Sequence, residues 1–425
     1  MLFQSVIPYS GFGFWFTFIL FLASSRIFNS LQSFLAIKNL IMIFISLSVI
    51  AAVTENINIA AAILIISTIV FIIGKILIAD LKHKNIKLGA TIFILVLFLC
   101  YFKYAIIQTN TNKIVALFID GAFILSPQNK HIYFIGISYF TFKFIHYLVD
   151  CRNKKIQESN FLTFINYITY FPSFFSGPIN RYNQFSEDIK NPHPESLFSK
   201  CSVPGVRRIV SGLFKKIVLA NSLLPYSIIS IDPLASNVTT GQILLGVYAY
   251  MFYIYFDFAG YTDMAIGCSK LIGIHLPENF NSPFLKRNLQ QFWANWHISL
   301  TTWLTDYIYW PIARKIRHFQ YFKKKPVTLS NVSIIITFIV CGLWHGDGSN
   351  FLLWGLYHGI GLAILNSYIL IERKYISNPW KKRINNSKVG FLLSLFITFQ
   401  YVAVGFFIFG CDIGKMTILL KKIVI

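Results

Sequence analysis

The sequence predicts an all-α, multi-pass membrane protein, and two observations of composition carry this prediction. Of the 425 residues, 55% are hydrophobic and only 13% are charged, with a mean hydropathy of +0.60, whereas roughly a quarter of the residues in average soluble proteins are charged. Aromatic side chains make up 17% of the chain, which excludes a disordered or low-complexity protein. A soluble globule of this size would lack the charged surface that keeps it in solution, so we expect about 9–12 transmembrane or re-entrant helices.

The apolar runs long enough to cross the roughly 30 Å hydrocarbon core set the expected spans. The first, at 6–23, has no basic residue before it, so we expect a transmembrane helix with its N-terminus outside and not a cleavable signal peptide. Further spans are expected at 31–53, 57–78, 88–108, 132–149, 241–267, 351–371 and 390–410, with weaker candidates at 161–179, 217–231 and 330–345. We expect one membrane domain over 1–425, with peripheral spans in 1–130 and a core in 131–410.

The charge balance indicates orientation in the membrane. Lys and Arg number 38 against 16 Asp and Glu, which gives a formal net charge of +22. In a soluble protein this excess would suggest nucleic-acid binding, but beside apolar spans it indicates cytoplasmic loops. Most of the basic residues fall in five clusters, at 82–87, 152–155, 200–216, 314–325 and 373–388. We therefore expect the lipid bilayer as the partner of this charge, and no nucleic acid.

One interval between the basic clusters does not fit a simple topology. If all five clusters face the cytoplasm, an even number of spans must separate neighbours, yet only 161–179 lies between the second and the third. This segment contains Pro172 and the pair Gly177-Pro178, so we expect a broken or re-entrant element. Such backbone is tolerated at membrane depth only where protein buries it or where it lines a cavity. The sequence therefore predicts a central funnel within the helical bundle.

The stretch 268–329 is less apolar and is interrupted by prolines, so we expect it at the cytoplasmic interface with one helix over about 288–309. One face of that helix would carry Phe292, Trp296, Ser299, Trp303 and Asp306, and the adjacent face Trp293 and His297. An aromatic stripe of this kind is typical of an interfacial anchor. A Ser, a His and an Asp among three Trp exceed what an anchor needs, so these residues are candidates for a site.

Among the nine histidines, His345 is the strongest candidate for chemistry. It closes an apolar run between Gly342 and Gly346, and an ionisable residue at membrane depth indicates function. Histidine suits a general base because it titrates near neutrality; the alternative is a core histidine hydrogen-bonded to a neighbouring carbonyl. His297 and His358 also have aromatic surroundings, and His146 closes a span, whereas solvated side chains are expected for His83, His131, His193, His275 and His318.

Two carboxylates, Asp257 and Asp263, lie near the end of the expected span at 241–267. At a spacing of six residues they point about 120° apart on a regular helix, which disfavours a paired-carboxylate mechanism. We expect them to satisfy buried donors. The six cysteines are isolated in the sequence, which predicts neither disulfides nor a metal site.

A series of ordered blocks then resembles a known family. The blocks include GISYFTF at 136–142, SGPINRY at 176–182, GLFKK at 212–216, LPENFN at 276–281, GLWHG at 342–346 and LWGLYHG at 353–359, and with the segments 255–267 and 292–307 the resemblance runs over 134–409. This pattern is similar to the membrane-bound O-acyltransferases, in the prokaryotic branch that modifies exported polymers.

The resemblance implies helices around a funnel through the membrane, with an acyl donor arriving from the cytoplasm. The near-invariant histidine of the family corresponds to His345, and its second, more cytoplasmic polar residue corresponds to His297. A positioned base would take the proton from an acceptor hydroxyl as it attacks the thioester. We expect supporting or substrate-binding roles for Trp296, Ser299, Trp303, Asp306, Trp344, Asp257, Asp263 and Tyr357.

Three functions stay open at this point. The first is transfer of an acetyl group from acetyl-CoA toward an exported polysaccharide, with an extracytoplasmic SGNH-type acyltransferase or a polymer-synthesis protein as partner. The second is transfer of D-alanine to a teichoic-acid-like polymer from a phosphopantetheinyl carrier protein. The third, a transporter or channel, predicts broken helices in two corresponding repeats, and no such symmetry is visible. No tightly bound cofactor is expected, and the location expected is the bacterial plasma membrane.

The sequence also departs from the family pattern. Asn295 and Thr305 stand where many members have arginine, so contacts of those arginines with the donor do not carry over. The basic residues Arg207, Arg208, Lys215 and Lys216 are substitutes that could face donor phosphates, although anionic lipid is the favoured contact.

Overall fold

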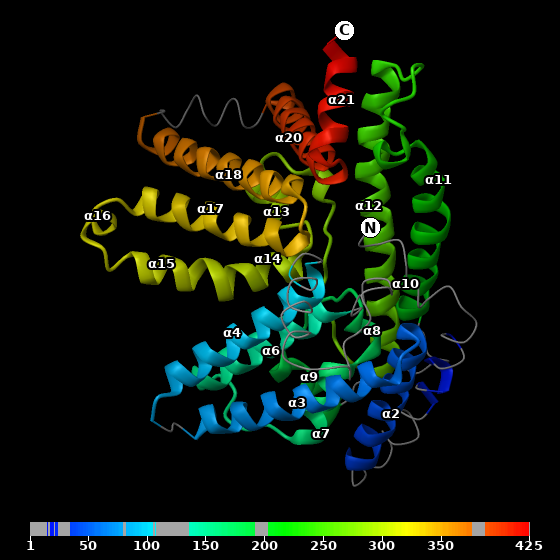
Figure 1. Ribbon diagram of the computed structural model, residues 1–425, viewed down its shortest axis with the longest axis vertical. Helices are drawn as coiled ribbons and strands as arrows, with labels where there is room; N and C mark the ends of the chain where they lie inside the picture. The colour runs from blue at the N-terminus through cyan, green and yellow to red at the C-terminus, as the bar shows by residue number, and fades with distance from the viewer. Residues whose placement is uncertain are drawn as a thin grey trace, which may run out of the picture. The chain divides into compact units, whose positions relative to one another are not determined.

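The computed structural model describes residues 15, 18–20, 22–23, 35–79, 82–104, 107, 136–191, 203–375 and 387–424. Within these ranges every regular element is helical, which confirms the all-α class (Figure 1). Seven of the described helices are long and apolar enough to cross a membrane, namely α2 (Leu35–Thr54), α3 (Ile57–Ile78), α4 (Lys84–Lys103), α12 (Thr240–Ile272), α17 (Pro326–His345), α18 (Ser349–Tyr375) and α20 (Lys388–Gly410). Most of the expected span at 6–23, the expected boundary near residue 130, and His131 and His193 lie outside the described residues.

The chain divides into two compact units. The first contains Met1–Gly212 and Tyr261–Pro277, and the second contains Leu213–Gly260 and Glu278–Ile425. Helix α12 therefore gives its first part to the second unit and its last part to the first.

In the first unit, α2, α3 and α4 pack with α6 (Ile137–Arg152) and α7 (Phe161–Thr169) (Figure 1). Asn56 and Asn160 begin α3 and α7, because each side-chain oxygen accepts a hydrogen bond from an amide of the first turn. Helix α6, expected as a span at 132–149, has 16 residues and is buried on almost every side. It is shorter than the roughly 20 residues that a span requires and forms the core of this unit.

The expected break in 161–179 is confirmed. Helix α7 ends at Thr169, the short α8 (Phe171–Phe174) follows, and the chain then continues without helix as far as Arg181. The first unit also contains α9 (Tyr182–Lys190) and α10 (Val203–Leu213). Lys143 on α6 donates to the carbonyl of Tyr167 over 2.9 Å, so the broken segment is held by the buried core helix.

The span expected at 217–231, near the start of the second unit, is wrong. Helix α10 continues as the π-helix η3 (Phe214–Ala220) and α11 (Asn221–Leu223), and it ends in the 3₁₀ turns η4 (Leu224–Tyr226) and η5 (Ile228–Ser230). The described part of the basic cluster at 200–216, which we expected in a loop, therefore lies on a helix. Apolar content alone placed this helical element too far toward the C-terminus, at 217–231, whereas the helix runs over 203–223.

The remaining elements of the second unit are short or pack in pairs. They are η6 (Pro283–Leu285), α13 (Leu289–Trp293), α14 (Ile298–Leu304), the π-helix η7 (Thr305–Tyr309), α15 (Trp310–Ile316), α16 (Gln320–Lys323) and α21 (Ile413–Val424). Helices α17 and α18 lie side by side as an antiparallel hairpin, and α18 also packs on α20 (Figure 1). The C-terminal helix α21 was not expected from the sequence.

Candidate active site

His345 is the last residue of α17, and the glycines of the α17–α18 hairpin fix its position. The turn after His345 leads directly into α18 at Ser349. A methyl group added to Gly342 would collide with the carbonyl oxygen of Phe351, and one added to Gly355 would collide with the carbonyl of Phe338. Only glycine permits this approach of two backbones. The hairpin is therefore rigid just where His345 leaves the helix.

Four aromatic rings surround the His345 imidazole. The ring centroids lie 4.6 Å from Trp344, 5.0 Å from Trp354, 4.9 Å from Phe409 and 6.4 Å from Phe351. His345 and Trp344 are half-buried, whereas Trp354 is buried. The imidazole thus stands at the edge of an aromatic cluster and is open on one side.

The far side of this cluster is tied to α20. The side-chain amide of Asn350 donates to the carbonyls of Ile408 and Phe409 over 3.3 and 3.2 Å. These bonds satisfy carbonyls at the end of α20, which have no partners within the helix. Asn350 therefore holds Phe409 against His345.

His297 does not lie within one helix over 288–309, and this expectation is wrong. Helix α13 ends at Trp293, and α14 begins only at Ile298. His297 itself has the left-handed conformation, with φ 43° and ψ 52°. A non-glycine residue in this region is uncommon and marks a constrained position. The common face expected for the stripe at 292–306 is consequently broken in the middle.

Asn279 explains why the helix breaks at this point. Its carbonyl accepts the amide of Ile298 over 3.0 Å, and its side-chain oxygen accepts the amide of Ser299 over 3.2 Å. A β-bridge joins the neighbouring Phe280 to Trp296. An extended segment thus takes over the orphan amides at the start of α14, and sequence reasoning did not single out Asn279.

The His297 imidazole is buried and neutral. Its side chain is 6% exposed, and its ring centroid lies 4.6 Å from that of Phe258. Burial lowers the pKa of His297 to about 3, because the charged form loses its hydration. Its Nδ1 atom has no hydrogen-bond partner among the described residues. Such an imidazole is a hydrogen-bonding group and a weak base.

The two tryptophans of the stripe serve packing. Trp296 is 8% exposed, and its ring lies 5.0 Å from Phe280 and 5.3 Å from Phe406. Trp303 is buried against Tyr307 at 5.4 Å. Both rings form the core beneath the site, so their role as direct substrate contacts stays a prediction.

The other candidates of the second unit lie in different environments. Ser299 is buried in the first turn of α14, whereas Asp306 is exposed on the π-helix η7. Tyr357 and Tyr401 stack at 4.2 Å, and each hydroxyl donates to the other residue's carbonyl, over 3.0 and 2.6 Å. Tyr357 therefore joins α18 to α20, and its hydroxyl is already hydrogen-bonded within the protein.

The two carboxylates of α12 are ion-paired, as their expected structural role requires. Lys216 on η3 donates to Asp257 over 2.5 Å, and both side chains are less than 10% exposed. Within the first unit, Arg208 on α10 donates to Asp263 over 2.8 Å. Lys216 and Arg208 are thus engaged by α12 carboxylates, and the suggestion that they face donor phosphates or lipid stays a prediction.

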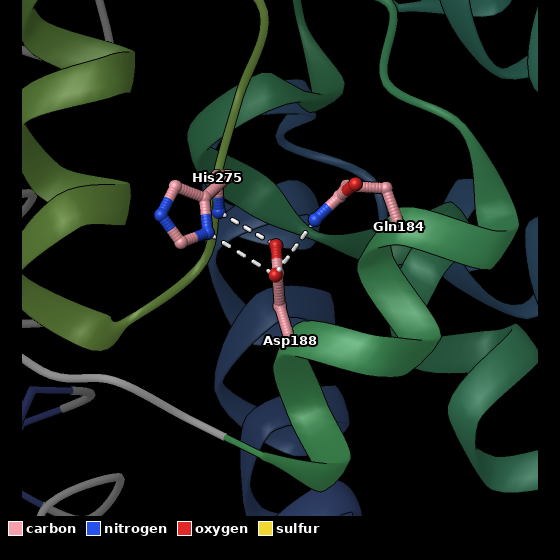
Figure 2. Close-up of polar contacts among 3 residues, drawn as sticks. All are labelled: Gln184, Asp188 and His275. Atoms are coloured by element: carbon pink, nitrogen blue, oxygen red, sulfur yellow. Dashed lines mark hydrogen bonds and ion pairs between the residues drawn. The ribbon is translucent and has the colours of Figure 1, made fainter.

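The structure confirms the aromatic surroundings expected for His358 and the exposed position expected for His275, and it adds a carboxylate contact to His275. His358 on α18 is 2% exposed, with its ring 5.1 Å from both Trp293 and Trp354. The exposed His275 donates through Nδ1 to the Asp188 carboxylate over 3.1 Å (Figure 2). Asp188 on α9 also accepts the backbone amide of His275 over 2.8 Å and the side-chain amide of Gln184 over 3.0 Å. This carboxylate anchors the loop after α12.

Comparison with known proteins gives a consistent set of relatives. Residues 84–408 match the membrane-bound O-acyltransferase family. A teichoic acid D-alanyltransferase of Bacillus subtilis is 32% identical over 297 residues, which cover 68% of this chain and 72% of that protein. A probable alginate O-acetylase, AlgI, of Pseudomonas aeruginosa is 32% identical over 73% of this chain and 55% of its own length. A peptidoglycan O-acetyltransferase of Helicobacter pylori is 30% identical over 65% of this chain and 54% of its own length.

Proposed function

Because the chain belongs to the membrane-bound O-acyltransferase family and is a multi-pass membrane acyltransferase, we propose that it transfers an acyl group to hydroxyl groups of an exported cell-envelope polymer. The donor is a thioester on the cytoplasmic side, and the acceptor lies on the outer side of the bacterial plasma membrane. The observation that carries this proposal is the placement of His345, half-buried at the end of a rigid hairpin within an aromatic cluster. An ionisable group in such surroundings carries an energetic cost of desolvation, and its presence there therefore indicates a function.

His345 acts as the general base in this proposal. The acceptor hydroxyl gives its proton to the imidazole while its oxygen bonds to the thioester carbonyl carbon. The carbon–sulfur bond then breaks, the ester is formed, and the departing thiolate takes up the proton as a thiol. A positioned base contributes about 10²–10⁴-fold to such a step.

His297 has a different role because burial holds its pKa near 3, far below that of a useful base. Its neutral imidazole has an Nδ1 atom without a partner among the described residues, so it offers a hydrogen bond in a dry environment. We assign it to orienting the donor, with Ser299 and Asp306 following it on the same chain segment.

Acetyl transfer from acetyl-CoA is the first candidate reaction, and relatives named as alginate and peptidoglycan acetylating proteins support it. D-alanyl transfer from a phosphopantetheinyl carrier protein is the second. Relatives named as teichoic acid D-alanyltransferases support it. For the acetyl reaction the proposed partner is an extracytoplasmic SGNH-type acyltransferase or a polymer-synthesis protein. The transporter alternative is not retained, because the chain is an acyltransferase.

The test measures ester-linked acetyl and ester-linked D-alanine separately on envelope polymers of cells that produce the protein or its variants. We expect His345→Ala to lower the ester content by at least about 10²-fold, the contribution of a positioned base. The matched control is His318→Ala, which removes an exposed histidine from the same unit and should change nothing. Wild-type ester content in a membrane-inserted His345→Ala protein would refute the proposed base. The ester that disappears identifies the acyl group.

A further inference from the structure

Trp354 contacts two imidazoles. Its ring centroid lies 5.0 Å from that of His345 at an interplanar angle of 85°, and 5.1 Å from that of His358 at 65°. Trp354 is 6% exposed and His358 is 2% exposed, whereas His345 is half-buried. The indole thus lies between the buried core of the second unit and the histidine at its accessible edge.

Rings on two other helices pack against this indole. Trp293 on α13 packs edge-to-face on Trp354 at 5.7 Å, and Phe409 on α20 packs on it at 5.5 Å. The next residue along α18, Gly355, is in backbone contact with α17. The indole is therefore packed between α13 and α20, and the neighbouring backbone lies close to α17.

A base that takes a proton becomes an imidazolium ion, and an ion is costly at the edge of an apolar cluster. The face of an indole attracts a cation, and tryptophan does so more strongly than the other aromatic residues. Near-perpendicular rings at about 5 Å have the geometry of an edge-to-face pair. The aromatic cluster around His345 therefore supplies a means of stabilising the charge that proton transfer creates.

We propose that Trp354 is a positioning residue for His345: it fixes the imidazole at the end of α17 and stabilises the imidazolium form. This inference rests on the proposed role of His345 as the base. The elements around His345 also carry other titratable groups, namely Cys341 on α17, Asp347 in the turn, Tyr357 and His358 on α18, Tyr401 on α20, and Cys411 and Asp412 beyond it.

The test follows the protonation of His345 without depending on activity. The full-length protein in detergent is treated with diethyl pyrocarbonate, which acylates a histidine only in its neutral form, and mass spectrometry measures the modification rate of His345 across pH. The plateau of this rate reports access to the ring, and its midpoint reports the stability of the imidazolium. In Trp354→Leu the midpoint should move to lower pH, so that reactivity below the midpoint, relative to its own plateau, rises about three- to tenfold. Trp354→Phe should give a smaller change of the same sign.

Two controls make the result specific. Trp310→Leu removes a half-exposed tryptophan of the same unit and should leave the His345 midpoint unchanged. Asp347→Asn measures how much the turn carboxylate contributes. An unchanged midpoint in folded Trp354→Leu would overturn the inference even if His345→Ala abolishes acyl transfer. Conversely, full transfer activity in His345→Ala would overturn the proposed base, while the midpoint shift would still report the ring contact.

Discussion

Replacing Lys216 by methionine tests whether the buried ion pair with Asp257 is a structural element. The two side chains are 8% and 9% exposed and lie 2.5 Å apart, so the substitution leaves a carboxylate buried without its partner. Removing one member of such a pair typically costs about 3–5 kcal/mol, because the remaining charge stays desolvated. In the double variant Lys216→Met with Asp257→Leu no charge remains, and the expected cost falls to near zero or becomes a gain.

The assay is reversible unfolding of the purified protein in mixed micelles of increasing denaturing detergent, followed by helical circular dichroism. The four proteins of the cycle give the free energy of unfolding for each single change and for the pair. Lys216→Met should lose about 3–5 kcal/mol and the double variant should recover most of it. Equal destabilisation of the single and the double variant would refute the reasoning, because the charge left behind would then not be the cause. Lys215→Met, one residue away, is the matched control.

Three further outcomes follow from the geometry. Gly355→Ala should destabilise the protein by about 1–3 kcal/mol in the same unfolding assay and lower ester content, whereas Gly89→Ala, where the added methyl group meets open space, should do neither. Asn279→Ala and Asn288→Ala each remove a helix cap worth about 1 kcal/mol, but only Asn279→Ala should also lower ester content, because it frees the backbone at His297. Finally, the free energy of unfolding should fall as pH drops below about 6.5, because the unfolded chain protonates His297 there while the pKa of His297 in the folded protein is about 3. His297→Gln should flatten this pH dependence. An unchanged dependence of unfolding free energy on pH in this variant would contradict the buried neutral imidazole.

Much of the fold was predictable because apolar runs and caps are local signals. Helix α3 was expected at 57–78 and has those bounds, since Asn56 caps an uninterrupted apolar run. The break within 161–179 was also predictable, because a proline restricts the backbone conformation of its own residue and of the residue before it. Helix α21 was missed, as its amphipathic sequence does not resemble a span.

The site was less predictable because its geometry depends on contacts between distant residues. Periodicity alone treats 288–309 as one helix, and nothing in that segment reveals that Asn279 takes over the amides of Ile298 and Ser299. Lys216 and Asp257 are 41 residues apart, and their pairing follows from the packing of η3 on α12. His345 was singled out as a candidate from the sequence because its flanking glycines and the apolar run before it are local signals.

The length of α12 has a consequence for the membrane around this enzyme. At 33 residues the helix is about 50 Å long, whereas the hydrocarbon core is about 30 Å thick. A helix of this length must tilt or extend beyond the core, and its carboxylates Asp257 and Asp263 lie in its last 16 residues, where ion pairs fix them. Because bilayers of different thickness change the tilt of an over-long helix, acyl transfer reconstituted in lipids of graded chain length should show an optimum set by hydrophobic matching along α12.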